Sequence, residues 1–412
     1  MSETKNPLAG IKVVDLSTYI AGPCCARYLA DLGAEVIKVE SSDGDPLRYT
    51  AINEGRPYGD MEDTSITLEN AGKKCVIFNL KTQKGQEAFH KLLADSQIFV
   101  TNWRPRALER AGLDYASLKE KYPALVMGLV SGYGENGPDK DLPGFDFTAF
   151  FARGGVLGTL YDRDSLPMFP LAGFGDHQVG LYLAGGILAA LYRARETGFG
   201  DQVIVSLLHS AIWDVSLILQ GNQYGKPATQ YPISRSEVAN QFLLAFRAKD
   251  GKWVQLAAPL YNKSYPLFMQ VIDRQDLIDD PRFFPQANVQ NNLKEFHELI
   301  TDTFLQKTSA EWSDLLTNAD IPFAVCQTWD TLLKDPQAWD SNCFAEVEFP
   351  SGQKRTMVRP PVQFTETPLP AYERAAFLGE NTEEILRKLG YSEEQVAAMI
   401  EAGDAVGCKR IG

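Results

Sequence analysis

Strands that alternate with helices in the first third of the chain constrain the fold more than any other feature. The expected strands are runs rich in Val and Ile at residues 11–17, 35–40, 75–80, 97–103 and 124–134. Helical segments stand between them at residues 22–34, 84–96 and 114–122. Short apolar runs separated by helices are typical of buried strands joined by crossovers. The pattern predicts an α/β fold with a mostly parallel sheet covered on both faces.

The first strand-to-helix turn argues against a dinucleotide cofactor. Ligands of a parallel sheet bind in the loops at the carboxyl ends of its strands. The turn after Asp15 reads LSTYIAGP and lacks the glycines of GxGxxG, which a pyrophosphate needs for close approach to the backbone. Glu40 ends the second strand, where a ribose-binding acid would stand. We therefore expect a Rossmann-like sheet that binds no nicotinamide cofactor.

Past about residue 225 the pattern changes to hairpins mixed with helices. Hairpins are expected at residues 240–259 and 343–361. We expect residues 1–225 to form the N-terminal part of a large α/β domain that binds the ligand. Residues 226–325 are expected to form a smaller α+β domain. Residues 326–412 are expected to be a linker and a C-terminal part that returns to the large domain.

Composition excludes several classes of protein. The net charge of -13 and the sequence pI of about 4.9 argue against a nucleic-acid-binding protein, so an anionic ligand needs a local basic cluster. The six cysteines contain no CxxC, which favours a reducing compartment. None of the four histidines stands at ligand spacing from another, so no metal site is expected. Neither a signal peptide nor a membrane-spanning run is evident, and we expect a cytoplasmic protein.

The stretch AGFGDHQVGLYLAGG, residues 172–186, contains the most informative single residue. Asp176 follows a glycine-rich turn and precedes a long, almost uncharged segment. Two interpretations are open from the residues alone. Asp is among the preferred helix N-cap residues, and a carboxylate with glycine neighbours is also accessible enough to act as a nucleophile.

Four ordered blocks resemble the class III CoA-transferases, the family of formyl-CoA and L-carnitine CoA-transferases. The blocks are residues 7–48, 73–126, 132–146 and 173–180, with weaker similarity at residues 280–283 and 378–392. Together they span essentially the whole chain. The stretches TNWRPRAL, PGFDFTAFFARGG and GDHQVG are most similar to the branch that acts on phenyllactate and 2-hydroxyisocaproate in amino-acid-fermenting anaerobes. The resemblance also implies an interlocked homodimer.

The resemblance implies that Asp176 is the nucleophile of a CoA transfer from an acyl- or enoyl-CoA to a 2-hydroxy carboxylic acid. The intermediate would be a mixed anhydride on that carboxylate. A helix N-terminus would favour the ionised form. Exchange of one thioester for another is near balance, so no permanently bound cofactor is expected, and coenzyme A esters are substrates.

The phosphates of CoA need cations, and their binding residues follow from the family match. Expected CoA-binding residues are Lys73, Lys74, Asn102, Trp103, Arg104 and Arg110, with Arg106 as a further candidate. The alternatives are that the basic residues are solvated surface and that Trp103 packs in the core. The substrate pocket is expected to include Ile20, Phe145, Asp146 and His177. The alternatives are that Asp146 caps the following helix and that His177 takes no part.

Departures from the family pattern bear on the expected substrate and on the alternative functions. The formyl-CoA enzymes carry a tetraglycine lid where this chain reads LAAPLYNKSY, and they have Gln where it has Ile20. Both changes make the pocket less polar, which suits a bulkier apolar acid. The related α-methylacyl-CoA racemases use the His of a GHD motif as a base, and here Phe145 takes that position and cannot accept a proton. A non-catalytic acyl-CoA-binding protein is the other alternative, and a burst of free CoA thiol would distinguish it.

Overall fold

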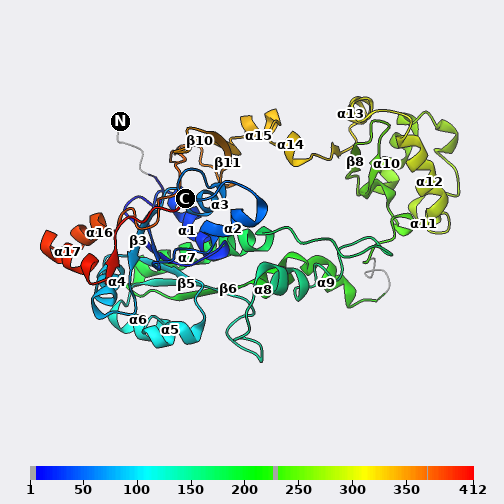
Figure 1. The fold of residues 1–412 in the computed structure, drawn as a ribbon. Helices are drawn as coiled ribbons and strands as arrows, with labels where there is room; N and C mark the ends of the chain where they lie inside the picture. Colours follow the sequence, from blue (N-terminus) through cyan, green and yellow to red (C-terminus); the bar gives the residue numbers. More distant parts are fainter. Residues whose placement is uncertain (1–5, 226–230, 369) are drawn as a thin grey trace. The chain divides into compact units, whose positions relative to one another are not determined.

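The computed structural model describes residues 6–225, 231–368 and 370–412. The chain forms two compact units (Figure 1). The first comprises the chain up to Val156 together with Pro170–Ser216 and Pro336–Gly412. The second comprises Leu157–Phe169 and Leu217–Asp335. The domain limits expected near residues 225 and 325 stay predictions.

A seven-stranded sheet forms the centre of the first unit, in the order β12-β3-β2-β1-β4-β5-β6. Its strands are β1 (Lys12–Leu16), β2 (Glu35–Glu40), β3 (Lys74–Phe78), β4 (Ile98–Thr101), β5 (Val126–Ser131), β6 (Gln202–Ser206) and β12 (Ala405–Val406). All neighbours are parallel except β12, which pairs antiparallel with β3. The predicted α/β fold with a mostly parallel sheet is confirmed.

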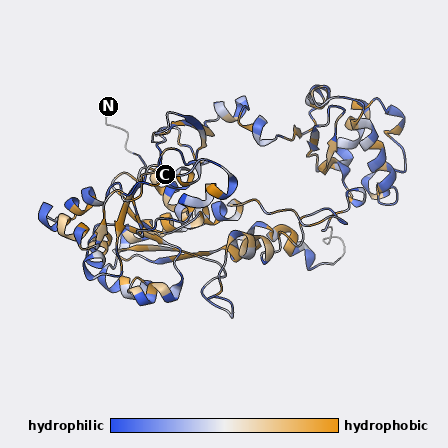
Figure 2. Cartoon of the chain, in the orientation of Figure 1, coloured by the Kyte–Doolittle hydropathy of each residue, from blue (hydrophilic) through white to orange (hydrophobic). Residues whose placement is uncertain are grey.

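One face of the sheet carries a large apolar cluster. Val14 lies opposite Ile37 of β2 and Phe99 of β4, and all three are buried. They pack with α4 (Gln83–Ala94), α5 (Pro105–Ala111), α6 (Tyr115–Lys121), α16 (Thr382–Lys388) and α17 (Glu393–Glu401). The strands are hydrophobic over much of their length (Figure 2), as expected for a parallel sheet buried on both faces.

Two packed helices, α1 (Ala21–Asp31) and α7 (Phe174–Thr197), cover the opposite face. Gly128 of β5 lets α7 approach closely, because a Cβ at that position would lie 2.6 Å from Cδ1 of Ile187. Helix α1 begins directly after the loop that follows β1. This packing places the N-terminus of α7 beside that loop.

The face covered by α1 and α7 also contains buried ion pairs. Arg48 of α2 (Leu47–Thr50) donates through Nε and Nη2 to the two carboxylate oxygens of Glu40, at 2.9 and 2.7 Å. Burial alone would raise the pKa of Glu40, but the Arg48 guanidinium lowers it to about 2. Glu40 therefore stabilises the segment after β2.

The second unit has its own aromatic core. Its antiparallel sheet contains β7 (Ala245–Arg247), β8 (Trp253–Leu256) and β9 (Phe323–Val325). Helices α10 (Tyr261–Val271), α12 (Leu293–Phe304) and α13 (Ser309–Asn318) pack around Phe242, Phe268 and Trp312. The hairpin predicted within residues 240–259 is confirmed. The second predicted hairpin is β10 (Phe344–Glu348) with β11 (Lys354–Val358), which belongs to the first unit.

Shorter helices complete the two units. In the first unit they are α3 (Thr64–Asn70), the π-helix η2 (Asp146–Ala152), α8 (Leu207–Asp214) and α15 (Pro336–Asp340). In the second they are α11 (Gln286–Val289) and α14 (Trp329–Leu332), and α9 (Ser216–Asn222) begins at the boundary. Across the described residues, every helix is too short or too polar to span a bilayer.

Candidate active site

The strand order identifies where a ligand can bind. From β1 the chain proceeds to β2 and β3 on one side, whereas β4 leads to β5 and β6 on the other. The loops after β1 and β4 therefore diverge, and ligands of open α/β sheets bind at such a switch point. A cavity of about 200 Å³ lies there, lined by the loops after β1, β4 and β5 and by Asp176.

Asp176 is the third residue of α7 and does not cap the helix. Gly173 occupies the N-cap position with φ of 80°, and no side chain of its own is available for capping. The carboxylate Oδ1 of Asp146, from η2, instead accepts the Gly175 N–H at 3.2 Å. Both capping interpretations from sequence are thus wrong: Asp146 lies inside η2 and caps α7, which leaves the Asp176 carboxylate to the cavity.

Gly175 makes this arrangement possible. A Cβ at that position would lie 2.4 Å from Oδ1 of Asp146 and 2.3 Å from Cγ of Phe150. Asp146 is buried and is not among the residues that line the cavity. Its second carboxylate oxygen, Oδ2, has no hydrogen-bond partner among the described residues.

The two carboxylates have raised pKa values for a shared reason. Burial raises the pKa of Asp176 to about 7, and the negative charge of Asp146 adds to the effect. Burial also raises the pKa of Asp146 to about 6, although N–H donors of Gly175 and Gly173 oppose it. A paired, desolvated carboxylate in a cavity is typical of a catalytic site.

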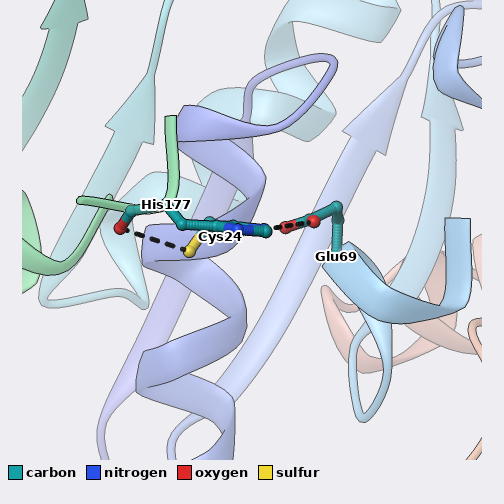
Figure 3. A group of neighbouring side chains, drawn as sticks. All are labelled: Cys24, Glu69 and His177. Atoms are coloured by element: carbon teal, nitrogen blue, oxygen red, sulfur yellow. Dashed lines mark hydrogen bonds and ion pairs between the residues drawn. The ribbon is translucent and has the colours of Figure 1, made fainter. Parts of the chain in front are cut away.

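His177 is held by a residue that sequence reasoning missed. Its Nε2 lies 2.8 Å from Oε1 of Glu69, a buried residue of α3 (Figure 3). Burial would lower the pKa of His177, but the hydrogen bond and charge of Glu69, with Asp176 and Asp146, raise it. His177 does not line the 200 Å³ cavity and lies along a neighbouring apolar one of about 260 Å³.

Cys24 joins this pair, and the donor atoms of Cys24, Glu69 and His177 lie within 4.8 Å of one another. Metal ions bind such sets, but here the His177 ring is hydrogen-bonded to Glu69, and the Cys24 thiol contacts the backbone carbonyl of His177 (Figure 3). The Cys24 Sγ donates to the His177 carbonyl oxygen at 3.9 Å, and burial raises the pKa of its thiol far above the usual range. Because the Cys24 thiol is protonated and Nε2 of His177 is bonded to Glu69, we interpret the three residues as a hydrogen-bonded cluster.

The loop after β4 contributes three of the expected CoA-binding residues. Asn102 accepts the Thr18 N–H at 3.1 Å and donates to the Thr18 carbonyl at 2.8 Å, so it fixes the loop after β1. Trp103 is half-buried, packs against the core of the α4–α6 face, and still lines the cavity. Arg104 is exposed at the cavity and makes no ion pair with any described residue.

The remaining expected cations lie elsewhere. Lys73 is buried, and its ammonium donates to Asp15 Oδ2, the Pro23 carbonyl and Asn70 Oδ1 at 2.8, 2.8 and 2.9 Å. An ammonium has three donors, so none remains for a phosphate. Lys74 pairs with Glu35 and Glu384 at 3.1 and 2.9 Å and lines a separate cavity of about 780 Å³.

The exposed Arg106 and Arg110 of α5 are outside the cavity lining. Arg106 pairs with Asp141 at 3.1 Å, and Nε of Arg110 donates to the Arg106 carbonyl at 3.2 Å. Lys140, in the loop after β5, lines the cavity and was not expected. Its place in a loop after a strand's carboxyl end is the sequence signal that would have found it.

Aromatic and apolar side chains form another wall of the cavity. Ile20 and Phe145 line it as expected, together with Tyr19. Tyr19 has φ of 63°, a left-handed conformation that is costly for a residue with a side chain and clusters at functional sites. Its ring meets Phe145 edge to face at 5.9 Å. The strained backbone thus presents an aromatic pair to the cavity.

Comparison with known proteins identifies the family of the chain. The model of CoA-transferase family III matches residues 8–382. The chain is 47% identical to the cinnamoyl-CoA:phenyllactate CoA-transferase of Clostridium sporogenes, covering 96% of each chain. It is 42% identical to the (R)-2-hydroxy-4-methylpentanoate CoA-transferase of Clostridioides difficile, covering 94% of this chain and 97% of that one.

Solved structures agree with the fold. A crystal structure of a Mycobacterium tuberculosis protein superposes with a TM-score of 0.79 at 26% identity, covering 91% of this chain and 98% of that chain. The protein therefore belongs to CoA-transferase family III, and the predicted class of enzyme is confirmed.

Proposed function

We propose that the protein transfers CoA from an acyl- or enoyl-CoA to an apolar 2-hydroxy carboxylic acid, with Asp176 as the nucleophile. The observation that carries this proposal is the place of Asp176: free of capping, desolvated, and facing the cavity at the switch point of the sheet. The relatives that act on phenyllactate and 2-hydroxy-4-methylpentanoate support the substrate class.

The proposed reaction needs one nucleophile and a retained thiolate. A carboxylate oxygen of Asp176 attacks the thioester carbonyl, the C–S bond breaks, and CoA leaves as its thiolate. The thiolate then attacks the aspartyl carbonyl of the anhydride, releasing the donor acid as a carboxylate. The acceptor carboxylate displaces the thiolate from the aspartyl thioester. The thiolate finally attacks the acceptor carbonyl and regenerates Asp176, so charge balances and covalent catalysis divides the step.

The CoA nucleotide is proposed to bind at the cavity edge formed by the loops after β4 and β5. Arg104 and Lys140 both line the cavity, and neither makes an ion pair with a described residue. Free cations bind phosphate through charge-assisted hydrogen bonds. Trp103 offers an aromatic surface beside them, Asn102 orders the loop, and Arg110 is a further candidate, whereas Lys74 lines a separate cavity. Lys73 has the buried contacts of a structural residue.

The acid side chain is proposed to lie against Tyr19, Ile20 and Phe145. A pocket of this composition gains about 0.8 kcal/mol per buried methylene. It would favour a bulky apolar acid over oxalate by several kcal/mol, whereas two bulky acids would differ only about ten- to a hundredfold. His177 and Asp146 act on the nucleophile from outside the cavity lining.

A homodimer in the cytoplasm, with no resident cofactor or metal, completes the proposal. Large apolar side chains are exposed on the first unit, among them Tyr192, Phe199 and Trp213, and such exposure is typical of interaction surfaces. The second unit exposes Leu217. All six cysteines are free, in keeping with a reducing compartment. Thioester exchange requires no redox or metal chemistry.

The decisive experiment traps the intermediate. Wild-type protein mixed with cinnamoyl-CoA and treated with hydroxylamine or borohydride should be modified at Asp176 in peptide mass spectra, with release of CoA thiol. Asp176→Ala should abolish both. Near-normal turnover of this variant would refute the assignment of Asp176 as the nucleophile.

Substrate class is tested by kcat/KM. Phenyllactate, 2-hydroxyisocaproate, carnitine and oxalate are compared as acceptors with the same CoA donor. The two 2-hydroxy acids with apolar side chains should be preferred. Preference for oxalate or carnitine would refute the proposed substrate class.

A further inference from the structure

A buried carboxylate next to the nucleophile has no role in the reaction as proposed. Glu69 is 3% exposed, and burying a charge is costly unless it is paired. Its ion-pair partner within the described part of the chain is His177, at 2.8 Å (Figure 3). His177 follows Asp176 directly in the first turn of α7. The fold thus holds the His177 imidazole next to the nucleophile, and this arrangement requires the Glu69 carboxylate to be buried.

Carboxylates dominate the charge that His177 experiences. The titratable and charged groups around it are Glu69 from α3, Cys24, Arg27 and Tyr28 from α1, Arg359 after β11, Asp146 of η2 and Asp176. Arg27 is engaged by Asp31 at 2.6 Å and by the Leu68 carbonyl at 2.5 Å. Burial aside, Glu69 acts most strongly, through its hydrogen bond and its charge, and with Asp176 and Asp146 it favours the protonated ring.

Attack on a thioester requires the ionised form of Asp176. Burial, the neighbouring Asp146 and, more weakly, Glu69 favour the neutral acid, and His177 is the group whose charge opposes them. A neutral residue of similar size would fill the same space without this effect. The arrangement therefore has an electrostatic use beyond packing.

We propose that Glu69 and His177 form a positioning pair that holds a protonated imidazole beside Asp176 and so increases the ionised fraction of the nucleophile near neutral pH. The inference rests on the proposed function of Asp176. Neither Glu69 nor His177 lines the 200 Å³ cavity, so the pair acts through the nucleophile.

His177→Gln tests the pair because the amide still donates to Glu69 but carries no charge. The acidic limb of the pH profile of kcat/KM should move to higher pH by about one pH unit. This is the lower end of the shift that a neighbouring charge produces, because the His177 side chain is 44% exposed to solvent. Activity should fall about tenfold at pH 6, because raising the pKa of Asp176 by about one lowers its ionised fraction about tenfold there. At pH 9, where Asp176 ionises in both proteins, the difference should be less than about twofold.

Glu69→Gln should shift the acidic limb in the same direction but by less, because removing the negative charge of Glu69 also removes its repulsion of the ionised Asp176. The double variant E69Q/H177Q buries no unpaired charge and serves if His177→Gln does not fold; its limb should lie between wild type and His177→Gln.

Loss of activity by the same factor at every pH, or no loss, would overturn the pairing. Stoichiometric binding of Zn²⁺ that His177→Gln abolishes would also overturn it, by showing that the cluster binds metal. An active Asp176→Ala variant would instead refute the proposed function, so the two failures are distinguishable.

Discussion

Replacing Lys73 with Met distinguishes a structural lysine from a phosphate-binding one. Lys73 is 5% exposed, and its ammonium donates to Asp15, Pro23 and Asn70. Methionine retains most of the side-chain length and volume but removes the charge and the donors. The buried Asp15 carboxylate would then keep Ser17 and the more distant Lys38, whose Nζ lies 4.0 Å from its Oδ2.

Breaking a buried ion pair costs about 3–5 kcal/mol, because one charge is left without compensation. Since Lys38 remains nearby, we expect the lower end of that range, about 3 kcal/mol. For a unit of this size each kcal/mol lowers the midpoint of thermal unfolding by about 2–3 °C. Lys73→Met should therefore unfold about 6–9 °C below wild type.

Lys74→Met is the matched control, because Lys74 is only half-buried and pairs with exposed carboxylates. Exposed pairs contribute about 0–1 kcal/mol, so this variant should unfold within about 3 °C of wild type. Both proteins are followed by circular dichroism on heating, and the KM for the CoA ester is measured about 20 °C below each midpoint, where both are folded. A fully stable Lys73→Met protein with a KM raised tenfold or more would refute the structural role of Lys73.

Two further predictions concern the cavity. Arg104→Gln and Lys140→Gln should each weaken binding by about 1.5–3 kcal/mol, as charge-assisted hydrogen bonds do, raising the KM for the CoA ester about tenfold or more at low salt and less at high salt. Arg106→Gln, whose side chain pairs with Asp141 outside the cavity lining, should leave this KM unchanged, and an equal effect of all three would contradict the assignment. The wild-type kcat/KM should fall as pH decreases through about 7, where Asp176 takes up a proton, and Asp146→Asn should move this limb to lower pH because a neighbouring negative charge is removed. A limb that moves upward in Asp146→Asn would refute the repulsion between the two carboxylates.

Local sequence determined the secondary-structure elements and pointed to Asp176 as the proposed nucleophile. The strands β1, β2, β4 and β5 lie within the apolar runs that predicted them, and β3 begins one residue before its run, because burial on both faces requires continuous Val and Ile. Asp176 was predicted from a motif of eight residues, GFGDHQVG, since glycine-rich turns and helix starts are local features. The predicted substrate-pocket residues Ile20 and Phe145 line the same cavity as Asp176.

Tertiary structure decided which charges meet. Lys73 and Lys74 are neighbours in sequence, but Lys73 is buried against Asp15 while Lys74 reaches Glu35 and Glu384. Glu69 and His177 stand 108 positions apart, and no local pattern connects them. Asp146 caps a helix that begins 28 residues later, and β12 completes the sheet from the far end of the chain. Periodicity reports whether a residue faces a core, whereas the partner of a buried charge depends on strand order and helix packing, which the chain settles only when distant segments come together.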